Sequence, residues 1–133
     1  MRLADILIHL GFVPDVDFVV RDDGAGPYIA AWRSQLTQPT PAELAVAEQP
    51  AAKAAAIAAN RAECSRRIFE RYPAGRQSSV ALGVYSGAEA QAQAQIMKDW
   101  ISDMVAAENT AADAIEAATT VQQVEAVTVA WPA

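Results

Sequence analysis

The stretch Asp15–Trp32, D-V-D-F-V-V-R-D-D-G-A-G-P-Y-I-A-A-W, predicts a β-hairpin near the start of the chain. Apolar residues recur at every second position of its first half, the period of a half-buried strand; they are Val16, Phe18 and Val20. The run Asp22–Gly26 supplies the turn, because glycine reaches positive φ without steric cost and aspartate binds the backbone two residues on. We expect the returning strand to present one face made of Tyr28, Ala30 and Trp32.

The acidic, glycine-containing turn also invites two ligand interpretations. A phosphate loop needs a longer glycine pattern that leads into a helix, whereas Gly26 leads into Pro27 and a strand. A calcium loop would use Asp22 and Asp23, but it needs further oxygen ligands at fixed spacing and a closing glutamate. The sequence therefore favours a structural turn.

Helix signals flank the hairpin on both sides. Residues Leu3–Leu10 follow the spacing of an amphipathic helix, and Gly11 stands where such a helix usually ends. After the hairpin, Thr40 is a helix N-cap with Pro41 at the first helical position, and Glu43 completes a capping box. Proline inside a helix loses a hydrogen bond and clashes with the preceding turn, so we expect a kink or break near Gln49, just before Pro50.

Residues Ala51–Arg71 predict a long helix, because alanine has the highest helix propensity and no breaker interrupts the run. Its alanine face suits close packing of another helix, within the chain or between subunits. Residues 72–75 end the helix. Residues Ser78–Tyr85 are ambiguous between an extended connector and a helical turn.

A second long helix is expected to begin near Ser86 or Gly87. It carries a broad apolar stripe at helical spacing: Ile96, Met97, Trp100, Ile101, Met104 and Val105. Asp99 and Asp103 are expected on its solvated arc. Thr120 with Gln123 is another capping-box signature, which predicts a short helix carrying Val121, Val124 and Val127 before a β-branched tail.

These elements predict an α+β, mostly helical fold. An N-terminal helix and β-hairpin come first, followed by two long antiparallel helices and a short C-terminal helix. Residues 1–37 would form the helix and hairpin module and residues 38–133 the helical region. A length of 133 residues suits one ordinary domain overall.

Composition excludes several classes of partner. A net charge of −6 and a pI near 4.6 argue against binding to nucleic acid or anionic lipid, which needs clustered cations. No apolar run approaches the length that crosses a bilayer. The charge is uneven: residues 61–76 hold five arginines against two glutamates, while residues 77–133 hold Lys98 against seven acids, so the two regions are expected to attract each other.

The sequence contains no recognisable set of catalytic residues. His9 is the only histidine and Cys64 the only cysteine, so triads and tetrahedral zinc sites lack their members, and no internal disulfide can form. We expect Cys64 to be a buried small hydrophobe and His9 an exposed helix residue. The sequence therefore predicts a non-enzymatic protein without metal or cofactor.

The arginines of residues 61–76 allow two interpretations. Glu63 faces Arg67 and Arg66 faces Glu70 at helical spacing, as in ordinary surface ion pairs. Arginine and aromatic residues are also favoured at interfaces. We expect partner contacts from these residues of the helices and the hairpin: Tyr28, Trp32, Arg67, Arg71, Tyr72, Arg76 and Trp100.

The segments D-F-V-V-R-D-D-G-A-G-P-Y-I-A-A-W and Q-P-T-P-A-E-L resemble small tail proteins of tailed bacteriophages, labelled tail fibre assembly or XkdW-like proteins. The strongest match is Asp22–Trp32 with Pro39–Leu44, and weaker echoes include R-I-F-E-R-Y-P and the final W-P. The resemblance implies a partner in the phage tail fibre, tail or baseplate and no catalytic residue. The alanine-rich run Ala42–Ala62 departs from the pattern and leaves the partner of that helix undetermined.

Two hypotheses from different classes follow. The first is an interaction protein that binds the tail fibre or tail tip, as a structural subunit or as a fibre assembly chaperone, with a homo-oligomer, a trimer on a trimeric fibre, as one form. It would act in the host cytoplasm during assembly or in the virion tail. The second is a phage-encoded, host-directed binding protein or inhibitor that acts through its acidic helical surface around Glu108, Asp113 and Glu116.

Overall fold

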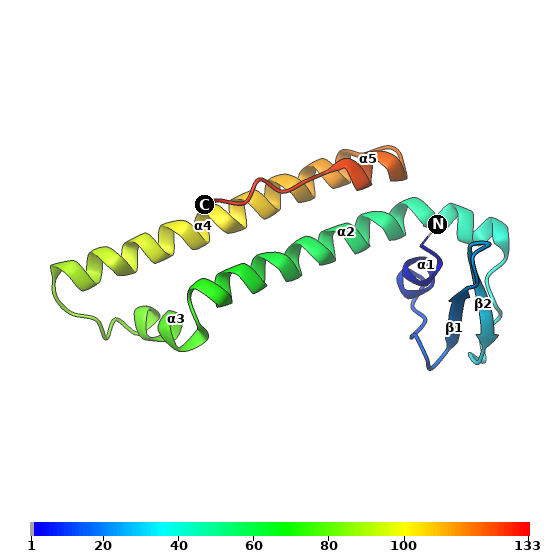
Figure 1. Ribbon diagram of the computed structural model, residues 1–133, viewed down its shortest axis with the longest axis horizontal. Coiled ribbons are helices and arrows are strands. Elements are labelled where there is room, and N and C mark those ends of the chain that lie inside the picture. Colours follow the sequence, from blue (N-terminus) through cyan, green and yellow to red (C-terminus); the bar gives the residue numbers. More distant parts are fainter. Residues whose placement is uncertain (1) are drawn as a thin grey trace. The chain divides into compact units, whose positions relative to one another are not determined.

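The chain folds into five helices and one two-stranded antiparallel sheet in a computed structural model that describes residues 2–133 (Figure 1). The architecture is α+β and mostly helical, as predicted. The elements in chain order are α1 (Leu3–His9), β1 (Phe18–Asp22), β2 (Pro27–Trp32), α2 (Pro41–Arg71), α3 (Ala74–Ala81), α4 (Ala88–Ala117) and α5 (Val121–Ala126).

Two compact units share these elements. Unit 1 holds the described residues up to Ala56 together with Ile115–Ala126, and unit 2 holds Ile57–Ala114 with Val127–Ala133. The long helices α2 and α4 each contribute residues to both units.

Helix α1 of unit 1 ends as its sequence predicts. Gly11 has φ +97° and donates its N–H to the Ile8 carbonyl, while the Phe12 N–H reaches the Leu7 carbonyl at 3.0 Å. This paired arrangement is the Schellman closure, which needs a left-handed residue that glycine adopts without cost. The helix is short because the glycine that ends it, Gly11, comes soon after its first residue, Leu3.

The hairpin forms where it was predicted, but one expected face is wrong. Phe18 pairs with Trp32 and Val20 with Ile29, and a β-bulge lies between Val19 and Val20. Opposite the bulge, Ala30 is the extra residue of β2, and an extra residue moves all following side chains to the other face. Ile29 and Trp32 therefore face the core, whereas Tyr28 and Ala30 are exposed.

The hydrogen bonds of the turn between the strands are those of a structural turn. A single carboxylate oxygen of Asp22 accepts the N–H groups of Gly24 at 2.9 Å and Gly26 at 3.2 Å. Both glycines have φ near +105°. The aspartate thus satisfies backbone donors that a tight reversal leaves unpaired.

Two neighbouring clusters of buried side chains form the core of unit 1. Leu3, Leu7 and Phe18 make the first, with Phe12, Val20, Ile29 and Trp32 packed against it. Ile6, Ala47 and Ala51 make the second, which joins α1 to α2. Leu44 packs against both. Burying each large side chain contributes roughly 1.5–3 kcal/mol, so Phe18, Ile6 and Leu7 are the main stabilising residues.

Helix α2 begins with the predicted capping box and continues through Pro50. The Glu43 N–H donates to the Thr40 hydroxyl at 3.2 Å, and the Thr40 N–H donates to the Glu43 carboxylate at 3.0 Å. Of the kink or break expected near Gln49, the break is wrong, because one helix spans Pro41–Arg71. Burial of Ala47 and Ala51 against Ile6 holds the helix on both sides of the proline.

Helix α4 ends in unit 1, where side chains of α2 satisfy its last carbonyls. The Lys53 ammonium donates to the Glu116 carbonyl at 2.7 Å, and the Gln49 amide donates to the Ala118 carbonyl at 3.3 Å. A cation is favourable at this end of a helix because the last carbonyls carry partial negative charge.

Helix α5 starts near its predicted cap. The Gln123 N–H donates to the Thr120 hydroxyl at 3.1 Å, but the Gln123 side chain accepts from Thr119 rather than from Thr120. Val124 is buried, and Val127 lies beyond the helix.

In unit 2 the ambiguous segment 78–85 is partly helical, because α3 covers Ala74–Ala81 and buries Val80. Helix α4 has a narrower buried stripe than the sequence suggested. Met97, Met104 and Ala111 are buried at intervals of seven residues, whereas Ile96 and Val105 are 51% and 41% exposed. Seven residues make almost two full turns of a helix, so these three side chains lie on one narrow face, and this narrow face is the buried one.

Candidate protein-interaction site

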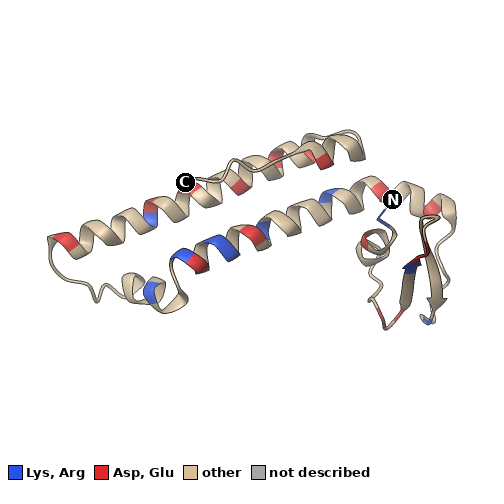
Figure 2. Cartoon of the chain, viewed as in Figure 1, with Lys and Arg blue, Asp and Glu red and all other residues tan. Residues whose placement is uncertain are grey.

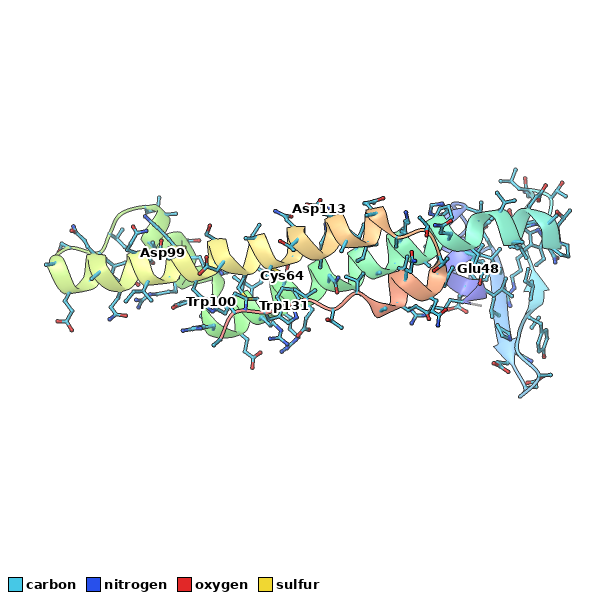
Figure 3. All side chains as sticks on the ribbon, turned by 90° about the horizontal axis from the view of Figure 1, so that it is seen from above. Glu48, Cys64, Asp99, Trp100, Asp113 and Trp131 are labelled. Carbon is cyan, nitrogen blue, oxygen red and sulfur yellow. The ribbon has the colours of Figure 1, made fainter. Side chains whose placement is uncertain are left out.

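Five side chains of unit 2 form an arginine–aromatic cluster: Arg67, Arg71 and Tyr72 of the α2 end, Trp100 of α4, and Trp131 of the C-terminal segment. Four of these were predicted as partner-binding residues, and the structure brings them together. Figure 3 labels Trp100 and Trp131. Trp131 is the member that sequence reasoning missed, although its position in the final W-P was noticed.

Arg71 is the centre of the cluster. Its guanidinium lies 4.5 Å from the centroid of the Trp100 ring and 5.6 Å from that of Tyr72. The two rings meet edge to face, with centroids 5.7 Å apart. A cation over an aromatic face is attracted by the negative face of the ring quadrupole, and this attraction is worth about 0.5–1 kcal/mol at an exposed site.

The C-terminal segment Val127–Ala133 closes the cluster. Arg67 lies 5.2 Å from the centroid of the Trp131 ring. The Ala133 backbone oxygen accepts hydrogen bonds from the Arg71 guanidinium at 3.2 Å and from the Trp100 indole at 3.1 Å. The helices therefore bind an aromatic side chain and a backbone oxygen at the same time.

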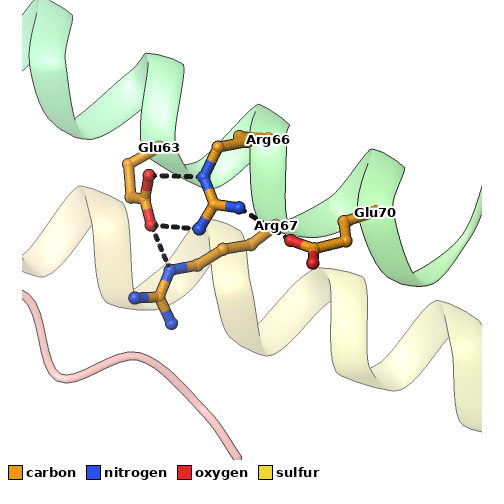
Figure 4. Close-up of polar contacts among 4 residues, drawn as sticks. All are labelled: Glu63, Arg66, Arg67 and Glu70. Carbon is orange, nitrogen blue, oxygen red and sulfur yellow. Dashed lines mark hydrogen bonds and ion pairs between the residues drawn. The ribbon is translucent and has the colours of Figure 1, made fainter.

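A network of ion pairs holds Arg66 and Arg67 of α2 (Figure 4). Glu63 accepts from Arg66 at 2.8 Å and from Arg67 at 2.7 Å, while Arg66 also reaches Glu70 at 2.7 Å. Hydrogen bonds from Arg66 and then Arg67 lower the pKa of Glu63 to about 2. Hydrogen bonds and charge from Glu63 raise the pKa of Arg66. The predicted ion pairs are thus confirmed, and they orient Arg67 toward Trp131.

Attraction between the basic and acidic regions is confirmed at one ion pair. Arg61 of α2 lies 3.5 Å from the Glu108 carboxylate of α4. Beside it Cys64 is buried, as predicted, and burial followed by a hydrogen bond with Glu108 raises the pKa of the thiol. The acidic residues Asp99 and Asp103 are exposed, as expected. Figure 2 shows the acidic positions spaced along α4 and the basic positions along α2.

Arg76 does not join the cluster in the contacts found for residues 2–133. Its guanidinium lies 4.8 Å from the centroid of the Tyr85 ring. The pair belongs to the α3 region of unit 2.

The hairpin places its two predicted residues differently. Trp32 is half-buried against Phe12, with ring centroids 4.7 Å apart, and its indole donates to the Leu36 carbonyl at 2.8 Å. Tyr28 is 42% exposed. Its hydroxyl donates to the Asp23 carboxylate at 2.6 Å, and this hydrogen bond, with a smaller effect of burial, raises the pKa of Tyr28.

Unit 1 also exposes large apolar side chains near the end of α1. Ile8, Leu10, Val13 and Val16 are between 41% and 64% exposed. They lie within nine residues of each other, before the first strand. Exposed apolar side chains that gather in one segment are typical of interaction surfaces.

Within residues 2–133 the histidine, cysteine and acidic side chains form no group of three or more that can hold a metal ion. None of the helices described is both long enough and apolar enough to span a membrane. His9 is exposed, as expected.

Part of the chain is similar to a known protein family. Residues 6–56 match the family model of the XkdW protein, a phage-associated family. The matched segment includes both stretches on which the resemblance was based, and it ends at the residue where the first segment of unit 1 ends. No curated protein and no solved structure matches the chain.

Proposed function

We propose that this chain is a non-enzymatic bacteriophage tail protein that binds the tail fibre or tail tip, as a structural subunit or as a fibre assembly chaperone. The observation that carries the proposal is the match of residues 6–56 to a phage-associated family, because this segment corresponds to a compact part of unit 1. The match supports a phage-associated protein, and binding to the fibre or baseplate is what we propose beyond it.

The surface of the matched segment supports a protein partner. It exposes Tyr28 on the hairpin and four apolar residues between Ile8 and Val16. Tyrosine combines a large apolar ring with a polar end, which suits interfaces. We assign the primary contact to these residues.

Co-expression with the neighbouring large open reading frame of the same phage genome tests the proposal. Affinity purification and light scattering on the soluble fraction would give complex formation and stoichiometry, and purified particles would be probed for the chain. A chain retained in particles is a structural subunit. A chain that solubilises its neighbour but is absent from particles is a chaperone, and absence of association in both experiments would refute the tail proposal.

A pair of matched variants locates the contact. Val13→Ser with Val16→Ser removes exposed apolar surface from the matched segment, and we expect it to lower recovery of the complex. Leu82→Ser with Val84→Ser removes comparably exposed residues of unit 2 and serves as the control. Equal recovery of the two double variants would place the contact elsewhere.

Salt dependence separates the tail proposal from the host-directed alternative. A contact through apolar side chains persists when ionic strength rises, whereas a contact through the acidic residues Asp113 and Glu116 weakens as charges are screened. Both acids are exposed. Binding to a basic host protein that is lost at high salt would favour the inhibitor.

A further inference from the structure

The C-terminal segment Val127–Ala133, called the strap below, lies in unit 2 against α2 and α4. Its side chains alternate between half-buried and exposed from Val127 to Trp131, which is the pattern of an extended segment. The strap takes part in none of the backbone hydrogen bonds found outside helices and strands in residues 2–133. Side chains of the helices hold it instead.

The contacts of the strap are concentrated at its end. Trp131 lies under Arg67, and the Ala133 oxygen accepts from Arg71 and Trp100. Arg67, Arg71 and Trp100 are called the strap groove below. Few polar groups hold the segment, and within residues 2–133 its backbone forms no hydrogen bond with another backbone group, which is typical of segments that open locally at low cost.

The middle of the strap packs loosely. An open cavity of about 240 Å³ lies between it and α4. Its walls are Ala107, Thr110, Ala111 and Ala114 of the helix and Val127, Thr128 and Ala130 of the strap. Small side chains on both sides leave this space. A segment with a larger apolar residue at the position of Ala130 would bury more surface there than the strap does.

We propose that the strap groove is a recognition site for an extended segment of a partner protein, and that the strap occupies it until this segment displaces it. The segment carries an aromatic side chain, a backbone acceptor two residues later and a larger apolar residue before the aromatic one. The aromatic side chain and the backbone acceptor correspond to Trp131 and Ala133 of the strap. The larger apolar residue replaces Ala130 and fills the cavity.

A second copy of this chain is a weaker occupant. Its strap makes the same contacts, but the strap of the same chain competes at an effective concentration of about millimolar because it is tethered. A partner segment displaces the tethered strap at a concentration below this effective concentration only if it makes contacts that the strap does not make. The cavity beside Ala130 provides such contacts.

Fluorescence anisotropy with labelled peptides tests the proposal. The probe is a labelled peptide with the sequence of residues 127–133, V-T-V-A-W-P-A, and the proteins are the full chain and its Trp131→Ala variant. We expect the variant to bind the peptide at least about tenfold more tightly than the full chain. The strap covers the groove in most molecules of the full chain, and the apparent affinity is reduced in proportion to the fraction of molecules whose groove is open. A peptide with Ala130→Leu should bind the variant about tenfold more tightly than the natural peptide.

The control variant is Phe69→Ala. Two helical residues correspond to about 200°, so Phe69 lies on the side of α2 opposite to Arg67 and Arg71. It is 52% exposed, and its replacement should leave peptide binding as weak as in the full chain. Trp131→Phe keeps a ring and should give an intermediate gain, which retains the test if Trp131→Ala lowers the helical circular dichroism signal.

Three results would overturn the proposal. Equal binding of the peptide to the full chain and to the variant means that the strap does not block the groove. Absence of binding to every protein means that the groove recognises no such segment. Dimers with exchanged straps, detected by light scattering, assign the groove to a second copy. The test is independent of the tail proposal, because the groove lies outside residues 6–56.

Discussion

At the scale of single residues, Glu63 links the charge network to the acid stability of the fold. Its pKa is lowered from 4.5 to about 2 by hydrogen bonds from Arg66 and Arg67. A carboxylate with a lowered folded-state pKa stabilises the fold above its unfolded-state pKa, and this contribution is lost as pH falls through the folded-state value. The relevant window is therefore from about pH 4.5 to about pH 2.

We predict that Glu63→Gln makes stability less dependent on pH in that window. The variant should be less stable than the parent at pH 6, and the difference should shrink as pH approaches 2. Urea unfolding followed by circular dichroism at several pH values measures it. Asp113→Asn, which changes an exposed carboxylate outside the salt bridges found in residues 2–133, is the control, and an identical pH profile for both variants would contradict the prediction.

Trp32 and Tyr28 lie on the same strand, β2, but are expected to differ in energetic role. Trp32→Ala should lower the free energy of unfolding by about 3 kcal/mol, because a half-buried ring that packs on Phe12 leaves a cavity. Tyr28→Ala should cost less than about 1 kcal/mol, since it removes mainly a surface hydrogen bond. Thermal unfolding measures both losses. Equal losses would contradict the prediction, because they would mean that Tyr28 contributes as much to packing as Trp32 does.

At the scale of elements, α2 carries an unfavourable residue in its interior. Pro50 lacks the N–H that would donate to the Val46 carbonyl, and proline costs about 3 kcal/mol in a helix interior. Burial of Ala47 and Ala51 offsets that cost. The helix is therefore held by tertiary packing rather than by its own propensity at this point.

Pro50→Ala should stabilise the protein by about 1–3 kcal/mol, because Pro50 is exposed and alanine restores the missing hydrogen bond. Val46→Ala, one turn earlier and 81% exposed, is the matched control and should change stability by less than about 0.5 kcal/mol. Urea midpoints measure both. A loss of stability in Pro50→Ala would mean that a bend at the proline is needed for packing against α1.

At the scale of the whole molecule, the chain builds separate cores in its two units. Phe18 is the largest fully buried side chain of unit 1, and Met104, with no exposed surface, is the corresponding residue of unit 2. Both long helices cross the boundary between the units. Local stability can therefore differ along a single helix.

Phe18→Ala and Met104→Ala should each cost about 2–5 kcal/mol. We expect hydrogen exchange of backbone amides to accelerate first in the unit that contains the substitution. Ile96→Ala on α4 removes an exposed side chain and should leave exchange unchanged. A uniform acceleration along residues 2–133 in both core variants would show that the units open together.

The sequence by itself determined the elements whose signals lie within a few residues. Gly11 closes α1, Asp22 holds the turn, and Thr40 with Glu43 caps α2, each by hydrogen bonds between residues at most five apart. Ion pairs at helical spacing, such as Glu63 with Arg67, were predictable for the same reason. Local hydrogen bonds are available to the chain before it is packed.

Only the tertiary structure decided which faces are buried and which distant side chains meet. The bulge between Val19 and Val20 moved Ile29 into the core, and packing of Ala47 and Ala51 carried α2 through Pro50. The strap groove joins Arg71 to Ala133, residues 62 positions apart. Such contacts depend on the summed packing of several elements, and apolar periodicity limits the possible faces without selecting the partner that covers them.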